Sequence, residues 1–275
     1  MISDQQLEQT PTSNATTLRE WLAEKPFAMT MSSGFFGFFA HCGVMSVLEE
    51  ENLLPTRASG SSAGALVVGC WAGGVPAQEL RDELLALQRK DFWDPGFGWG
   101  LLKGELFRKR LLSILPVETF AECRIPLAVS AYDLKTRSTQ VLNEGPLHLA
   151  IQASCAFPFM FQPVRIQKNR YLDGGIADRP GLMGMPKDER LFFHHLASKS
   201  PWRRKNSKDL KIPKRDNMVS MVIGELPRVN PFRLERGVQA FNIAREATQV
   251  ALDSPIENDQ VMVFPGQYLP TSPSK

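Results

Sequence analysis

The first candidate for chemistry is Ser62, which lies in a run of small residues. Positions 58–64 read ASGSSAG, so Gly60 and Gly64 flank the serine in a Gly-x-Ser-x-Gly pattern. This pattern is typical of a nucleophilic serine on a sharp turn between a strand and a helix, where glycines let two backbones approach closely. The following helix would direct N–H groups and the positive end of its dipole towards an anion. The sequence therefore indicates a nucleophile elbow at Ser62.

Strands and helices alternate around this serine. We expect a buried strand over 27–31, a helix over 38–51, a strand over 53–58 and a helix over 63–71. This order builds a mainly parallel sheet covered by helices, so we predict a three-layer α/β/α sandwich. The other expected strands lie at 125–132, 138–143, 162–166, 170–172, 190–196, 218–223 and 260–264, and the other helices include 101–115, 147–155 and 233–252.

Composition places the chain among ordinary globular proteins. It has 275 residues, enough for one large domain, and its net charge of +3 is too small to imply nucleic acid as a partner. The four cysteines have neither CxxC nor metal-ligand spacing, so we expect free thiols in a reducing compartment. The first residues lack the basic and apolar regions of a signal peptide, and no apolar run reaches the roughly 18 residues of a membrane span. These features predict a cytoplasmic protein.

Four stretches, in order, resemble the patatin-like phospholipase family. They are the loop 32–37 with AHCGV at 40–44, GSSAG at 60–64, ASCAFP at 153–158 with FQPV at 161–164, and LDGG at 172–175. The serine motif is shared with many hydrolases, but its pairing with a distant Asp-Gly-Gly is more specific. The resemblance covers residues 27–180 and implies a single patatin-like catalytic domain. We place this domain at 17–265, between a disordered arm at 1–16 and a frayed tail at 266–275.

The resemblance implies a catalytic dyad, with Ser62 as nucleophile and Asp173 as base. A serine hydroxyl is a poor nucleophile until a base takes its proton, and a desolvated, rigidly held carboxylate can do this in place of histidine. Gly174 and Gly175 would let their loop bring the carboxylate close to the elbow without a side-chain clash. Alone, an aspartate before two glycines is typical of a turn, but its pairing with the serine favours catalysis.

Family members hold the donors of the oxyanion hole in a loop that reads Gly-Gly-Gly-x-Arg/Lys-Gly. Here positions 32–37 read SSGFFG, so two serines replace glycines and Phe36 replaces the basic residue. Backbone N–H groups are the donors, each worth about 3–4 kcal/mol in hydrolases, so a hole can still form at Gly34, Phe35, Phe36 and Gly37. The wall of the acyl pocket is assigned to Phe157, Pro158, Phe159 and Phe161.

These residues predict a lipid acyl hydrolase that forms an acyl-enzyme and uses no cofactor and no metal ion. Its substrate would be a phospholipid, a lysophospholipid or another acyl-ester lipid. One alternative is an esterase with a Ser-Asp-His triad that uses His194 or His195, although both lie inside an expected strand. The other is a catalytically weak lipid-binding or scaffold protein, suggested by the altered loop at 32–37.

Two further segments suit a lipid surface. The glycine-rich aromatic loop 91–100, expected near the mouth of the site, contains Trp93 and Trp99, and the stretch 199–215 is strongly basic around Trp202. Tryptophan and cationic side chains favour lipid headgroups, so we expect peripheral membrane contact. No stacking series or known module in the sequence favours nucleic acid.

Overall fold

The computed structural model describes residues 15–197 and 211–268. Most of the predicted arm 1–16, the basic stretch 199–215 and the tail 266–275 lies outside these residues, so the division of the chain stays a prediction. Among the described residues, no helix is both long and apolar enough to cross a bilayer.

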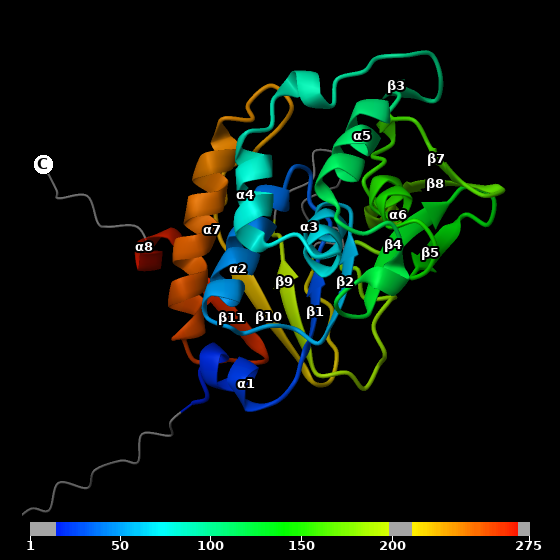
Figure 1. Ribbon diagram of the computed structural model, residues 1–275. Helices are drawn as coiled ribbons and strands as arrows, with labels where there is room; N and C mark the ends of the chain where they lie inside the picture. The colour runs from blue at the N-terminus through cyan, green and yellow to red at the C-terminus, as the bar shows by residue number, and fades with distance from the viewer. Residues whose placement is uncertain (1–14, 198–210, 269–275) are drawn as a thin grey trace, which may run out of the picture.

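A nine-stranded sheet forms the centre of the molecule (Figure 1). Its strands are β1 (Ala28–Met31), β2 (Arg57–Ser61), β4 (Leu127–Asp133), β5 (Ser138–Leu142), β7 (Val164–Ile166), β8 (Asn169–Asp173), β9 (Leu191–His195), β10 (Met218–Ile223) and β11 (Gln260–Val263). They lie in the order β11-β10-β9-β1-β2-β4-β8-β7, and β5 also pairs with β4. The strands from β11 to β4 are parallel to one another, whereas β5, β8 and β7 run antiparallel to their neighbours. The predicted mainly parallel α/β class is therefore confirmed.

The helices pack mainly against one face of this sheet, so the described residues form one helical layer where the predicted three-layer sandwich has two (Figure 1). They are α1 (Leu18–Glu24), α2 (Phe38–Glu50), α3 (Ala63–Ala72), α4 (Ala77–Leu85), α5 (Glu105–Ile114), α6 (Leu147–Ser154), α7 (Arg236–Leu252) and α8 (Pro265–Tyr268). The two longest, α2 and α7, lie against each other, and α3 lies against both β1 and β2. This arrangement brings the amino ends of α2 and α3, which directly follow β1 and β2, to the same edge of the sheet.

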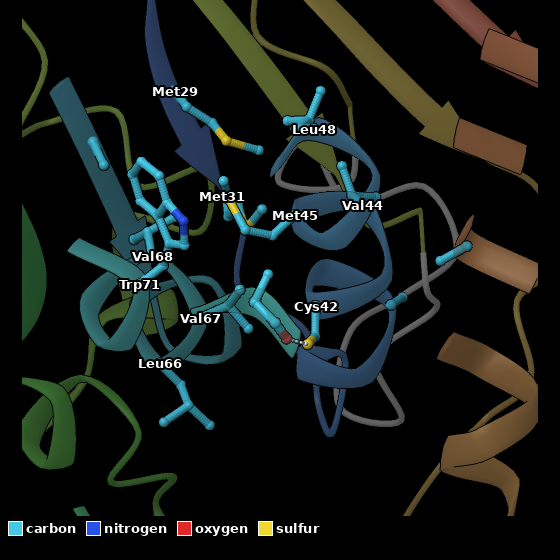
Figure 2. Close-up of a cluster of buried hydrophobic side chains, with 14 of the residues drawn as sticks. Met29, Met31, Cys42, Val44, Met45, Leu48, Leu66, Val67, Val68 and Trp71 are labelled. Atoms are coloured by element: carbon cyan, nitrogen blue, oxygen red, sulfur yellow. Dashed lines mark hydrogen bonds between the residues drawn. The ribbon is translucent and has the colours of Figure 1, made fainter. Parts of the chain in front are cut away.

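The main core lies between β1 and the helices α2 and α3. Figure 2 shows Met29 and Met31 of β1 directed towards Met45 of α2 and Trp71 of α3. Because side chains alternate along a strand, Ala28 faces the opposite side, where it packs in a smaller apolar cluster. Burying each large side chain contributes about 1.5–3 kcal/mol, so the core fixes the two helices that begin at the candidate site.

The strand before the elbow lies further along the chain than predicted. We expected it over 53–58, but β2 spans Arg57–Ser61, and it pairs with β1 as far as Gly60 and with β4 as far as Ser61. The prediction followed the apolar residues at 53–55, whereas the strand is built from small residues that fit between two neighbouring strands and under α3. Gly60 shows the constraint, because a Cβ there would lie 2.6 Å from the backbone N of Ala65.

The prediction of a helix over 101–115 is wrong at its start. Residues Gly100–Leu102 form strand β3, which pairs with β6 (Phe159–Phe161) in a separate two-stranded sheet. The helix begins only at Glu105, because Gly104 has a left-handed φ of 79°. The carboxylate of Asp94 accepts hydrogen bonds from the N–H groups of Gly104 and Leu106 and so fixes this start. Such a cap from ten residues upstream has no local signature.

Candidate active site

Ser62 occupies a strained turn between β2 and α3. Its φ of 52° and ψ of −118° lie in a region that residues other than glycine rarely adopt. The turn needs glycines on both sides, since a Cβ at Gly64 would lie 2.0 Å from the carbonyl oxygen of Met31. The conformation is that of the expected elbow, with the serine side chain directed into a cavity.

The hydroxyl of Ser62 donates a hydrogen bond of 2.6 Å to Oδ2 of Asp173. The other carboxylate oxygen, Oδ1, accepts a hydrogen bond of 2.7 Å from the N–H of Gly175, which fixes the plane of the carboxylate. Asp173 ends β8 and is only 4% exposed. The elbow and the Asp-Gly-Gly turn, 111 residues apart, therefore meet in hydrogen-bond contact.

The two glycines after Asp173 allow this approach. A Cβ at Gly174 would lie 2.1 Å from the carbonyl oxygen of Ser130 on β4, and a Cβ at Gly175 would lie 2.2 Å from Oγ of Ser33. Both distances are far below van der Waals contact. The Asp-Gly-Gly sequence thus lets the turn fit between β4 and the loop that follows β1.

That loop, the expected oxyanion loop, carries free donors. The N–H groups of Gly34, Phe35 and Phe36 make no hydrogen bond to another described group, and all three residues line the cavity that contains Ser62. Phe36 has a positive φ of 54°, so this loop is also strained. Gly37 takes a different role, because its N–H donates to the carbonyl oxygen of Gly34 and closes a turn.

A pair of buried histidines holds the start of this loop. Nε2 of His41 lies 2.8 Å from the carbonyl oxygen of Ser32, and Nδ1 of His41 lies 2.8 Å from Nδ1 of His194. A carbonyl oxygen only accepts, so Nε2 of His41 carries its hydrogen, and Nδ1 of His194 donates to His41. Burial lowers the pKa of His41 to about 3 and the pKa of His194 well below its usual value, so both rings are neutral near pH 7.

This pair predicts how stability depends on pH. The unfolded chain binds protons on these histidines below about pH 6.5, whereas folded His41 does so only near pH 3. The free energy of unfolding should therefore fall as the pH drops from 6.5 towards 3, by about 1.4 kcal/mol per pH unit for each histidine kept neutral. In His41→Gln, the slope of the unfolding free energy against pH between pH 6.5 and 4.5 should correspond to about one proton fewer taken up on unfolding. Urea unfolding at several pH values measures this slope. An unchanged slope would contradict the assignment.

The cavity around Ser62 has a volume of about 660 Å³ and an apolar wall. All four residues predicted for the acyl pocket line it, together with the oxyanion loop and Asp173. Aromatic rings connect the two groups, because Phe35 of the loop packs on Phe157 with ring centroids 5.3 Å apart. The further apolar wall comes from Leu66, Leu80, Leu84, Phe92, Phe107, Leu111 and Ile114. A cavity of this size and lining suits an acyl chain.

Two residues that contact the elbow were not singled out from the sequence. Oγ of Ser154 accepts a hydrogen bond of 2.8 Å from the N–H of Ser62 and donates one of 2.7 Å to the carbonyl oxygen of Ser130. The thiol of Cys155 lies 3.2 Å from the carbonyl oxygen of Ser62. Burial raises the pKa of this thiol well above its usual value, so it stays protonated and is no competing nucleophile. Both lie in the ASCAFP stretch, which was the available signal.

The candidate triad histidines lie elsewhere in the sheet. His194 and His195 are buried in β9, and β1 separates this strand from β2 and the elbow. Within residues 15–197 and 211–268, neither histidine makes a hydrogen bond to Ser62. His194 instead contacts His41, which holds the start of the loop 32–37.

Comparisons with known proteins give a consistent result. An uncharacterised NTE family protein of Mycobacterium tuberculosis is 30% identical over 155 residues, which are 55% of this chain and 43% of the relative. The uncharacterised protein YqhO of Bacillus subtilis is 26% identical over 180 residues, 53% of this chain and 62% of that protein. The chain thus spans less than half the length of the NTE family relatives that it matches.

A solved structure and a family model also match this chain. The structure of VipD from Legionella pneumophila superimposes with a TM-score of 0.59 over 84% of this chain and 67% of VipD, at 15% sequence identity. At this identity the similarity concerns the fold alone. The profile described as patatin-like phospholipase matches residues 29–185, which is more than half of the chain and includes the elbow, the loop after β1 and the Asp-Gly-Gly turn. This chain belongs to the patatin-like phospholipase family.

Proposed function

We propose that this protein is a lipid acyl hydrolase in which Ser62 is the nucleophile and Asp173 is the general base. The observation that carries the proposal is the 2.6 Å hydrogen bond from Ser62 Oγ to Asp173 Oδ2 in the wall of an apolar cavity. The family to which the chain belongs supports hydrolysis of acyl-ester lipids as the class of reaction.

The reaction proceeds through an acyl-enzyme. Oγ of Ser62 attacks the carbonyl carbon of the ester while its proton moves to Oδ2 of Asp173. The oxyanion of the tetrahedral intermediate accepts hydrogen bonds from the free N–H groups of residues 34–36. The carbon–oxygen bond to the alcohol then breaks, and the alcohol leaves with the proton from Asp173. Water attacks the acyl-enzyme with the same base, which releases the fatty acid and returns the proton to Ser62.

An oxyanion hole made of backbone donors can form in spite of the altered loop sequence. Phe36 replaces the basic residue of the family pattern, but the three N–H groups depend on the conformation of the backbone and not on that side chain. The phenylalanine instead packs on Phe92, with ring centroids 5.9 Å apart, and adds to the apolar wall. We infer that the substrate has a long acyl chain and is a phospholipid, a lysophospholipid or a neutral ester. The protein would reach this substrate in the cytoplasm, by peripheral contact with a membrane.

The test is release of fatty acid from phosphatidylcholine, lysophosphatidylcholine and a p-nitrophenyl ester by the purified protein, followed by mass spectrometry. We expect release from at least one lipid, and retention of this activity in His195→Gln per folded molecule. Loss of turnover in folded His195→Gln would favour the triad esterase. Binding of lipid by the folded wild type without any release would favour the lipid-binding alternative.

A further inference from the structure

The loop before β3 and the strand itself together hold three large apolar side chains in solvent. Along Gly96-Phe97-Gly98-Trp99-Gly100, the glycines face inwards, since a Cβ at Gly98 would lie 2.7 Å from the amide of Gln162 and one at Gly100 would lie 2.3 Å from the backbone of Phe161. The alternate positions must then point outwards. Phe97 is fully exposed, Trp99 is 72% exposed, and the next alternate residue, Leu101, is 51% exposed.

Two hydrogen bonds hold this loop in its exposed conformation. The amide of Gln162 donates a hydrogen bond of 2.8 Å to the carbonyl oxygen of Phe97, and the N–H of Gly96 donates one of 3.0 Å to the carbonyl oxygen of Leu101. The loop therefore cannot fold its aromatic rings inwards without losing these bonds. Exposed aromatic residues that a structure holds outwards mark a contact surface.

The same exposed surface reaches the mouth of the cavity. Phe159 pairs with Gly100 across the small sheet, is 84% exposed and lines the cavity that contains Ser62. Its φ of 64° is strained for a phenylalanine. We call Phe97, Trp99, Leu101 and Phe159 the apolar tip. The two segments that carry it, 95–102 and 149–164, contain no Asp, Glu, Lys or Arg.

A group of cations lies on turns close to the tip along the chain, since β7 begins at Val164, three residues after β6 ends at Phe161. The β4–β5 and β7–β8 turns project from the same side of the molecule as the segment leading into β3 (Figure 1). The two turns are joined by a hydrogen bond of 2.9 Å from the N–H of Leu134 to the carbonyl oxygen of Arg170. Their exposed basic residues, which we call the cationic edge, are Lys135, Arg137, Arg165, Lys168 and Arg170.

The cationic edge has no internal counter-charge. None of its five side chains forms an ion pair within the described part of the chain. The acid in these turns, Asp133, is buried and accepts hydrogen bonds from the N–H groups of Lys135 and Thr136 and from the amide of Asn169. The edge is therefore complementary to an anionic surface.

We propose that the apolar tip and the cationic edge together dock this protein on an anionic lipid bilayer. The apolar tip enters the headgroup region, and the cationic edge binds the anionic headgroups beside it. Docking in this orientation brings the mouth of the cavity, at Phe159, against the bilayer, so that an acyl chain can pass from lipid to cavity along apolar wall. The proposal deepens the proposed function and rests on it for the identity of the substrate.

The test measures vesicle binding separately from catalysis. Ser62→Ala protein is sedimented with vesicles of phosphatidylcholine alone or mixed with phosphatidylserine, so that no lipid is hydrolysed. We expect binding to the mixed vesicles that weakens with salt. Phe97→Ser/Trp99→Ser should weaken binding to both kinds of vesicle by about tenfold or more. Arg165→Gln/Lys168→Gln/Arg170→Gln should weaken binding to the mixed vesicles by about tenfold or more and leave binding to phosphatidylcholine unchanged.

Matched controls come from parts of the sheet away from the tip. Met262 is an exposed apolar residue on β11, the far edge of the sheet. Lys25 and Lys187 are exposed cations that precede β1 and β9, at the opposite end of these parallel strands from the elbow. Met262→Ser and Lys25→Gln/Lys187→Gln should bind as the parent does. Equal binding by all variants, or no binding by the folded parent, would overturn the docking proposal. When the same tip and edge substitutions are made in protein that keeps Ser62, the variants should hydrolyse a soluble short-chain ester at the wild-type rate. This result separates failed docking from failed catalysis.

Discussion

Ser62→Ala is expected to lower kcat for ester hydrolysis by about 10⁴-fold or more, because removal of the nucleophile ends the covalent route. The alanine keeps the cavity and the free N–H groups at 34–36, so lipid should still bind with a similar Kd. Its smaller side chain also leaves the strained turn in place, and the folded state should retain its stability within about 1 kcal/mol. The readouts are fatty acid release, lipid binding and urea unfolding.

The chain contains a matched control for this substitution. Ser130 on β4 donates a hydrogen bond of 2.6 Å to the carboxylate of Asp178, the same length as the Ser62–Asp173 bond. Ser130 is buried and does not line the cavity. Ser130→Ala should therefore keep its turnover per folded molecule. Equal losses of turnover in Ser62→Ala and Ser130→Ala would show that a serine–carboxylate bond supports the fold and not the chemistry.

Asp173→Asn should lower kcat by about 10²–10⁴-fold and leave KM almost unchanged, because general-base catalysis acts in the transition state. The asparagine has nearly the same shape, and its oxygen can still accept the hydrogen bond from the N–H of Gly175. Its amide would then face Ser62 Oγ, where it donates a hydrogen bond and takes no proton. Steady-state kinetics with a soluble ester measure the change.

Asp178→Asn provides the contrast to Asp173→Asn. The Asp178 carboxylate accepts hydrogen bonds from Ser130 and from the N–H groups of Gly181, Leu182 and Met183, so it holds the chain after the Asp-Gly-Gly turn. Its substitution should lower the free energy of unfolding and leave kcat per folded molecule nearly intact. If Asp173→Asn behaved in this way and kept its kcat, Asp173 would be a structural aspartate and not a base.

The sequence was sufficient for the fold class and for the residues that meet at the site. Gly60 and Gly64 beside Ser62 and the two glycines after Asp173 are local requirements, since a Cβ at any of them would lie within 3 Å of backbone or of a neighbouring side chain. Local requirements of this kind leave a pattern in the sequence. The family motifs added the pairing of two turns that lie 111 residues apart.

The features that could not be predicted depend on contacts between distant segments. The start of α5 depends on Asp94, and the conformation of the loop 32–37 depends on His41 and His194, which come from α2 and β9. The cationic edge forms because β4 and β8 pair antiparallel and bring together two basic turns, at 135–137 and 165–170, that are far apart in the sequence. Propensity and periodicity contain no information about such pairings.

The most direct test of the Ser62–Asp173 assignment is covalent labelling with a fluorophosphonate, followed by peptide mass spectrometry to locate the modified residue. We predict a single adduct on Ser62 in the wild type, strongly reduced labelling in Asp173→Asn, and undiminished labelling in Asp178→Asn per folded molecule. An adduct on another serine, or labelling of Ser62 at an equal rate in Asp173→Asn, would contradict the assignment of these two residues as nucleophile and base.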